Sequence, residues 1–183
     1  HLCIRAAGIE SGDLVITTPF SFVASTNVIL FEKAIPVFVD VDGVTGNINV
    51  DLLEQAVEDL MSGGKAAEKW LPRSGAAPHG KLKAILAVDV FGQPADYDRI
   101  QKIANKYGLT VIEDSCESLG AEYKGKKTGL FGKYGVFAFY PNKQITTGEG
   151  GMIVTDDDHD AGLMRALRNQ GRAPGDNWLQ HTE

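Results

Sequence analysis

Six short runs of mostly apolar residues limit the folds that this chain can adopt. Strands of a parallel sheet are buried on both faces, so they lack the in–out alternation of a half-exposed strand. Helix-forming segments separate most of these runs, and a strand–helix–strand order predicts βαβ units with right-handed crossovers. We therefore expect a three-layer α/β/α fold with a mostly parallel sheet. The expected strands are residues 14–18, 36–42, 82–88, 109–112, 136–139 and 152–155.

The segments between these runs carry helix signals. Asn49 and Asp96 each precede a segment with apolar residues at helical spacing, and their side chains can cap a first turn. Residues 22–31 are apolar on most faces, which predicts a well-buried helix. The expected helices are residues 22–31, 50–62, 97–107 and 158–170.

The domain organisation is less regular near the middle and the ends of the chain. Residues 62–82 are rich in Gly, Ala, Lys and Pro, which predicts an exposed loop insertion. The first eight residues resemble the end of a helix closed by Gly8, and no closing signal follows residue 177. We therefore expect residues 1–183 to form the central part of a larger domain, incomplete at both ends, with a C-terminal small domain absent.

Composition excludes several classes of function. The net charge of −6 comes without a basic stripe, which argues against nucleic-acid binding. The sequence shows no apolar run long enough to cross a membrane and no signal peptide, so we expect a cytoplasmic protein. Cys3 and Cys116 lack disulfide or metal spacing, which indicates a reducing compartment.

Polar residues at strand ends are the candidates for a functional site. In open α/β sheets, ligands bind beyond the carboxyl ends of the strands. An apolar strand that ends in two adjacent carboxylates must place at least one of them near the core or the site. The residues concerned are Thr17, Thr18, Asp40, Asp42, Asp89, Glu113, Asp114 and Lys143.

Lys143 follows the expected strand 136–139 and precedes a glycine-rich segment. Pro141 ends the strand because it has no N–H for the ladder. Lys143 therefore lies on a stiff turn, where it is either a solvent-facing hairpin lysine or a lysine aimed at a site. Asp114 leaves two readings as well, since it can cap a following turn or face the same site.

A carboxylate at one strand end and a lysine beyond another form the pair that pyridoxal phosphate requires. The lysine amine forms an imine with the cofactor aldehyde, and the carboxylate keeps the pyridine nitrogen protonated. The same lysine can carry a proton once the incoming amine has released it. Asp114 and Lys143 are the candidates for these two roles.

The stretches around these residues closely resemble the DegT/DnrJ/EryC1/StrS family of sugar aminotransferases, which use pyridoxal 5'-phosphate. The resemblance covers nearly the whole chain apart from residues 62–82. It implies the large domain of the aspartate aminotransferase fold, fold type I. The matching stretches are Gly12–Asp13, Phe20–Ser25, Pro36–Asp42, Asp89–Asp96, Glu113–Ser115 and Tyr140–Gly151.

The resemblance also implies roles for single residues. Lys143 would be the catalytic, cofactor-binding lysine, and Asp114 would be the partner of the pyridine nitrogen. Phe22 falls where the family has an aromatic ring that stacks on the cofactor, although a core phenylalanine is the alternative. Glu117 falls near the cofactor ring, where the family usually has Gln or His. No metal ligands are implied.

The cofactor phosphate is the part of the site where this sequence departs from the family. Ala138 occupies the position where many members have a phosphate-binding serine, and alanine cannot make that bond. Tyr140 and neighbouring backbone amides are possible substitutes. The resemblance places the other phosphate-binding residues before His1, and those lent by a partner subunit after Glu183.

Three other signals do not point to a function. Residues 120–127 approach a phosphate-binding P-loop, but Lys127 stands where Ser or Thr would hold Mg²⁺. The sequence has no Gly-x-Gly-x-x-Gly after a strand. Its four histidines, His1, His79, His159 and His181, are scattered without metal-ligand spacing.

The resemblance implies an enzyme that aminates a nucleotide-linked keto-sugar in sugar, polysaccharide or natural-product biosynthesis. Glutamate or glutamine is the expected amino donor, and a homodimer with sites at the interface is the expected assembly. Two alternatives stay open. One is a non-catalytic regulatory or interaction member of the same fold, and the other is another fold type I lyase or desulfurase.

Overall fold

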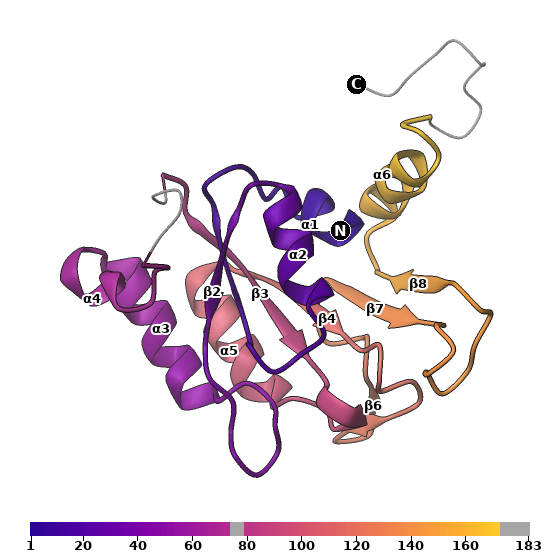
Figure 1. The fold of residues 1–183 in the computed structure, drawn as a ribbon, viewed down its shortest axis with the longest axis horizontal. Helices are drawn as coiled ribbons and strands as arrows, with labels where there is room; N and C mark the ends of the chain where they lie inside the picture. Colours follow the sequence, from indigo (N-terminus) through magenta and orange to yellow (C-terminus); the bar gives the residue numbers. More distant parts are fainter. Residues whose placement is uncertain (74–78, 173–183) are drawn as a thin grey trace.

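The computed structural model describes residues 1–73 and 79–172 of the chain. A six-stranded sheet forms its centre, in the order β2-β1-β3-β4-β7-β8 (Figure 1). The first five strands of that order run parallel, and β8 is antiparallel to β7. All six expected strands are confirmed, with bounds β1 (Leu14–Thr17), β2 (Ile35–Phe38), β3 (Leu82–Val88), β4 (Thr110–Asp114), β7 (Tyr134–Ala138) and β8 (Gly151–Val154).

Helices cover both faces of this sheet, which confirms the three-layer prediction. One buried cluster joins the strands to α3 and α5, and a second joins them to α1, α2 and α6. Figure 1 shows the two groups of helices on opposite sides of the strands. The helices are α1 (Leu2–Ala6), α2 (Ala24–Phe31), α3 (Val50–Ser62), α5 (Tyr97–Tyr107) and α6 (Asp158–Arg168).

Alternation along each strand supplies both clusters from one run of apolar residues. In β1, Ile16 belongs to the α3/α5 cluster, whereas Val15 belongs to the α1/α2/α6 cluster. In β4, Val111 and Ile112 divide in the same way. Successive side chains of a strand point to opposite faces, so a strand covered on both faces must be apolar throughout.

The predicted helix caps form. The Asn49 side chain accepts hydrogen bonds from the backbone N–H groups of Asp51 and Leu52, at 3.0 and 3.1 Å. Asp96 accepts from the backbone N–H of Arg99 at the start of α5. These bonds satisfy amide groups that have no partner within the helix.

Three predictions about exposure were wrong. The helix expected to be well buried, α2, buries only Ser25 and Ile29, and Phe31 at its end is 63% exposed. The strand expected to be buried over residues 136–139 is only half-buried at Val136–Ala138 of β7. The strand expected to be buried over residues 152–155 is also not buried, since β8 is exposed in its first half and half-buried in its second. Apolar composition predicted elements at the right places, but it could not show which faces meet a neighbour.

Some local structure lies between the main elements. The expected loop insertion at 62–82 contains a short helix, α4 (Gly64–Glu68). Residues 74–78 of the insertion lie outside the described residues. A short 3₁₀ turn, η1 (Val90–Gly92), follows β3. The stretch that approaches a P-loop is a hairpin of β5 (Glu122–Tyr123) and β6 (Lys126–Lys127). None of the described helices is long and apolar enough to span a bilayer.

Candidate active site

The two adjacent carboxylates at the end of β4 point to opposite faces of the sheet. Glu113 is fully buried and accepts backbone hydrogen bonds from Gly129, at 2.7 Å, and from Gly132. Burial raises the pKa of Glu113 to about 6, although these backbone bonds act in the opposite direction. Glu113 therefore holds the loop between β6 and β7, and its role is structural.

Asp114 faces the other side, toward the start of α2. Its Oδ2 accepts a hydrogen bond from the Ser25 hydroxyl at 2.8 Å, and Oδ1 accepts one from the Cys116 N–H at 3.3 Å. The Ser21 hydroxyl lies 2.8 Å from that of Ser25. Each carboxylate oxygen has two lone pairs, so the half-buried Asp114 keeps acceptor capacity for a ligand.

Lys143 lies in the turn beyond β7, as the sequence predicted. Its backbone N–H donates to the Tyr140 carbonyl at 3.0 Å, and Thr147 closes the loop with a bond to the Phe139 carbonyl at 3.0 Å. Only 16% of the Lys143 side chain is exposed. Its Nζ lies 3.4 Å from Oε1 of Glu117.

β4 and β7 are adjacent in the sheet, and Asp114, at the end of β4, is paired with Val136 of β7. Lys143, in the loop beyond β7, contacts Glu117, which lies three residues after Asp114. The carboxylate at the end of β4 and the lysine beyond β7 therefore lie in the same part of the carboxyl edge of the sheet. Burial, and next the charge of Asp114, raise the pKa of the Cys116 thiol between them in sequence, whereas the charge of Lys143 lowers it. The chemistry predicted for the Asp114–Lys143 pair needs this proximity.

The remaining predicted residues follow strands at the carboxyl edge of the sheet: Phe22 follows β1, Glu117 follows β4 and Tyr140 follows β7. Phe22 is 79% exposed, so it is not a core residue of the described part of the chain. Tyr140 is 51% exposed, and its hydroxyl has no partner among residues 1–73 and 79–172. The roles of Phe22, Glu117 and Tyr140 toward a cofactor stay predictions.

Asp89, another polar residue at a strand end, has a structural role. It is fully buried, and its two oxygens accept from the Ala95 N–H, at 3.0 Å, and from three hydroxyl groups. The hydroxyl groups belong to Tyr97 (2.7 Å), Ser115 (2.9 Å) and Ser118 (2.8 Å). Burial, and next the Asp89 charge, raise the pKa of Tyr97 well above its usual value.

Sequence reasoning missed the two serines that lead to Asp114. Ser21 and Ser25 lie four residues apart, a spacing that brings side chains together on one side of a helical turn. The available signal was the short connection between the expected strand and the next expected helix, because it brings the hydroxyl groups on it to the carboxyl edge of the sheet.

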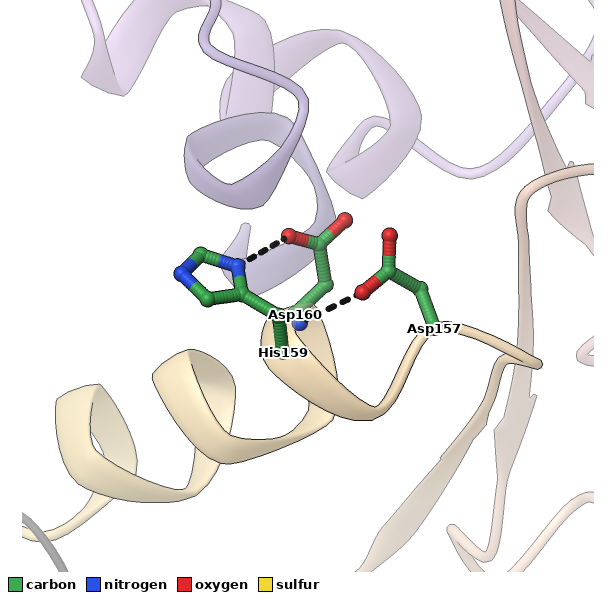
Figure 2. Close-up of side chains that lie close together, drawn as sticks. All are labelled: Asp157, His159 and Asp160. Carbon is green, nitrogen blue, oxygen red and sulfur yellow. Dashed lines mark hydrogen bonds and ion pairs between the residues drawn. The ribbon is translucent and has the colours of Figure 1, made fainter.

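A separate cluster of Asp157, His159 and Asp160 lies at the start of α6 (Figure 2). Asp157 caps the helix through the Asp160 N–H at 3.0 Å, and the Asp160 carboxylate pairs with Lys133 at 2.6 Å and accepts from the Tyr134 hydroxyl. Although burial acts to raise it, the bonds from Lys133 and Tyr134 lower the pKa of Asp160 to about 2. The cluster is a helix cap joined to an ion pair, and we assign no metal to it.

Solved structures share this fold. A DegT DnrJ EryC1 StrS aminotransferase from Brucella abortus matches 99% of this chain with a TM-score of 0.82 and 34% identity, over 45% of its own length. The family description DegT/DnrJ/EryC1/StrS aminotransferase matches residues 1–182. The chain belongs to this family.

Two curated relatives show the same extent of similarity. EpsN of Bacillus subtilis, described as a pyridoxal phosphate-dependent aminotransferase, is 42% identical over the whole chain and 43% of its own length. GDP-perosamine synthase of Caulobacter vibrioides is 41% identical over 95% of the chain and 41% of its own length. The chain thus spans less than half the length of these relatives.

Proposed function

We propose that this chain is part of a pyridoxal-phosphate-dependent aminotransferase that acts on a nucleotide-linked keto-sugar. The observation that carries the proposal is that Lys143, in the loop beyond β7, contacts Glu117 just after β4, whose last residue, Asp114, is paired with Val136 of β7. Names of relatives support the cofactor and the substrate class, since EpsN is described as pyridoxal phosphate-dependent and another relative is a GDP-perosamine synthase.

The residues present fit such a cofactor. Lys143 has one side-chain partner among the described residues, Glu117, and its amine can leave that partner. Asp114 is fixed by Ser25 yet keeps free lone pairs, as a partner for a pyridine N–H must. Phe22 offers an exposed ring at the same edge. When bound, pyridoxal phosphate accepts the electrons released as a substrate C–H bond breaks.

The chain's own residues then have distinct tasks. Asp114 would accept a hydrogen bond from the ring nitrogen and so hold a proton there. The Lys143 amine would attach the cofactor and, once released, would move a proton at the reacting carbon. Phe22 would offer its ring to the cofactor, and the Tyr140 hydroxyl and nearby amides would hold its phosphate. Glutamate or glutamine is the proposed amino donor.

The proposal includes the setting of this site. We place the chain as the central part of a fold type I large domain, with residues 62–82 as an insertion. The protein is proposed to work as a cytoplasmic homodimer. The shorter span of this chain relative to its relatives supports the first of these statements.

A regulatory member of the same fold is the second candidate. Ala138 favours it, because its side chain cannot bind a phosphate group at the end of β7. The two candidates differ in whether Lys143 takes up the cofactor covalently.

The test is the substitution Lys143→Ala in the full-length protein, with Lys65→Ala, an exposed lysine of α4, as the matched control. Each protein is incubated with pyridoxal phosphate and reduced with borohydride, and the adduct is located by peptide mass spectrometry. Glutamate consumption with a panel of nucleotide keto-sugars measures turnover. We expect the adduct on Lys143 in the wild type and the control, and a loss of turnover of about a thousandfold or more in Lys143→Ala.

Two outcomes would count against the proposal. An unchanged turnover in Lys143→Ala would show that another residue attaches the cofactor. A wild-type protein that binds no cofactor covalently would favour the regulatory candidate.

A further inference from the structure

Glu117 lies where three segments of the chain meet. It follows β4, its Oε2 accepts a hydrogen bond from the Phe91 N–H in η1 at 2.9 Å, and its Oε1 lies 3.4 Å from the Lys143 Nζ. Its backbone carbonyl accepts a bond from the Gln144 side chain. Glu117 thus links the turn after β3 to the loop after β7.

The η1 turn fits closely against Glu117. Phe91 has a φ of 53°, a left-handed conformation that is rare for a bulky residue. Gly92 has a φ of 85°, and a Cβ there would lie 2.9 Å from the Glu117 carbonyl oxygen. The bond from Phe91 fixes one carboxylate oxygen and leaves the other directed at Lys143.

The contact between Glu117 and Lys143 joins opposite charges in a partly shielded place. The side chains are 39% and 16% exposed, respectively. Glu117 is the one side-chain partner of Lys143 in residues 1–73 and 79–172. A partly exposed ion pair of this kind favours the charged form of the amine by a small factor, and salt weakens the attraction.

We propose that Glu117 is a positioning residue that holds the Lys143 amine, as an ammonium group, whenever that amine is not bonded to the cofactor. The inference rests on the proposed function for the cofactor lysine, although the ion pair can be tested without any cofactor. The pair keeps the lysine against the segment that follows Asp114 during the part of the cycle in which the amine is free.

The test measures how readily Lys143 reacts in the cofactor-free, full-length protein. Cyanate adds only to an uncharged amine, and peptide mass spectrometry follows its addition to Lys143. Glu117→Gln keeps an acceptor for the Phe91 N–H but removes the charge opposite Lys143. We expect Lys143 to react about two- to threefold faster in this variant at the same pH. Glu122→Gln, which breaks the exposed pair with Lys127, is the matched control and should leave the rate unchanged.

A salt series separates an ion pair from simple packing. Raising the ionic strength should speed the reaction of wild-type Lys143, because screening weakens the pair, and should have no such effect in Glu117→Gln. The salt series can be run on the wild type alone, so it tests whether the contact is an ion pair even if the variant fails to fold. A rate that is unchanged or slower in Glu117→Gln, or a wild-type rate that does not respond to salt, would overturn the inference.

The same samples distinguish this inference from the proposed function. Pyridoxal phosphate and borohydride are added after the cyanate measurement, to separate aliquots. A wild-type protein with no adduct on Lys143 contradicts the proposed function, while the cyanate rates still report on the Glu117–Lys143 pair. If the wild type forms the pyridoxal phosphate adduct on Lys143 but the wild type and Glu117→Gln react with cyanate at equal rates, only the inference about the Glu117–Lys143 pair is contradicted.

Discussion

Asp89 and Asp114 lie at the ends of neighbouring strands, yet their carboxylates differ in burial and in the number of hydrogen bonds that they accept. The Asp89 N–H bonds to the Asp114 carbonyl at 3.0 Å, so the two residues lie side by side. Asp89 is fully buried and accepts four hydrogen bonds from its own chain, whereas the half-buried Asp114 accepts two. A carboxylate whose lone pairs are all used holds the fold, and one with lone pairs to spare can hold a ligand.

The largest expected effect on stability comes from removing the Asp89 carboxylate. Asp89→Ala leaves four donors without an acceptor, in a site closed to water, and should lower the free energy of unfolding by about 3–5 kcal/mol. Asp114→Ala should cost about 1 kcal/mol, since its partners can find water or Ser21. Urea unfolding of the two full-length variants measures the difference. Equal losses would remove the distinction between the two aspartates.

A smaller effect concerns pH and sharpens the contrast within β4. Burial raises the pKa of Glu113 to about 6, from 4.5 in an unfolded chain. The folded state then binds the proton more tightly, so the contribution to stability is complete below pH 4.5 and is lost as the pH rises through about 6. The loss amounts to about 2 kcal/mol.

Glu113→Gln supplies the comparison, because glutamine does not titrate. The difference in unfolding free energy between wild type and variant should fall by about 2 kcal/mol between pH 4 and pH 7, as measured by urea unfolding at each pH. A difference that stays constant, or that grows as the pH rises, would show that burial does not raise the pKa of Glu113.

Much of this arrangement follows from the sequence. The apolar runs predicted the strands, and the rule that ligands bind at carboxyl ends of strands predicted the edge where Lys143 and Asp114 lie. The alternation of Val111 and Ile112 between two faces also separates Glu113 from Asp114, because side chains two residues apart share a face.

Other features depend on contacts between distant segments. The donors to Asp89 include Tyr97 from the next helix and Ser118 from the loop after β4. No local sequence pattern indicates that these two side chains bind the same carboxylate. The exposure of Phe31 on α2 depends on which elements cover that helix, which apolar composition does not state. The position of Glu117 between Phe91 and Lys143 results from a turn with an unusual φ, which the sequence did not indicate.

The most direct test of the account is Asp114→Asn in the full-length protein. An amide keeps the size of the side chain but cannot hold a proton on a pyridine nitrogen as a carboxylate does. We predict that Lys143 still takes up the cofactor, that the free energy of unfolding stays within about 1 kcal/mol of the wild type, and that turnover falls by about a hundredfold or more. Turnover within a few fold of the wild type would contradict the assignment of Asp114 to the site.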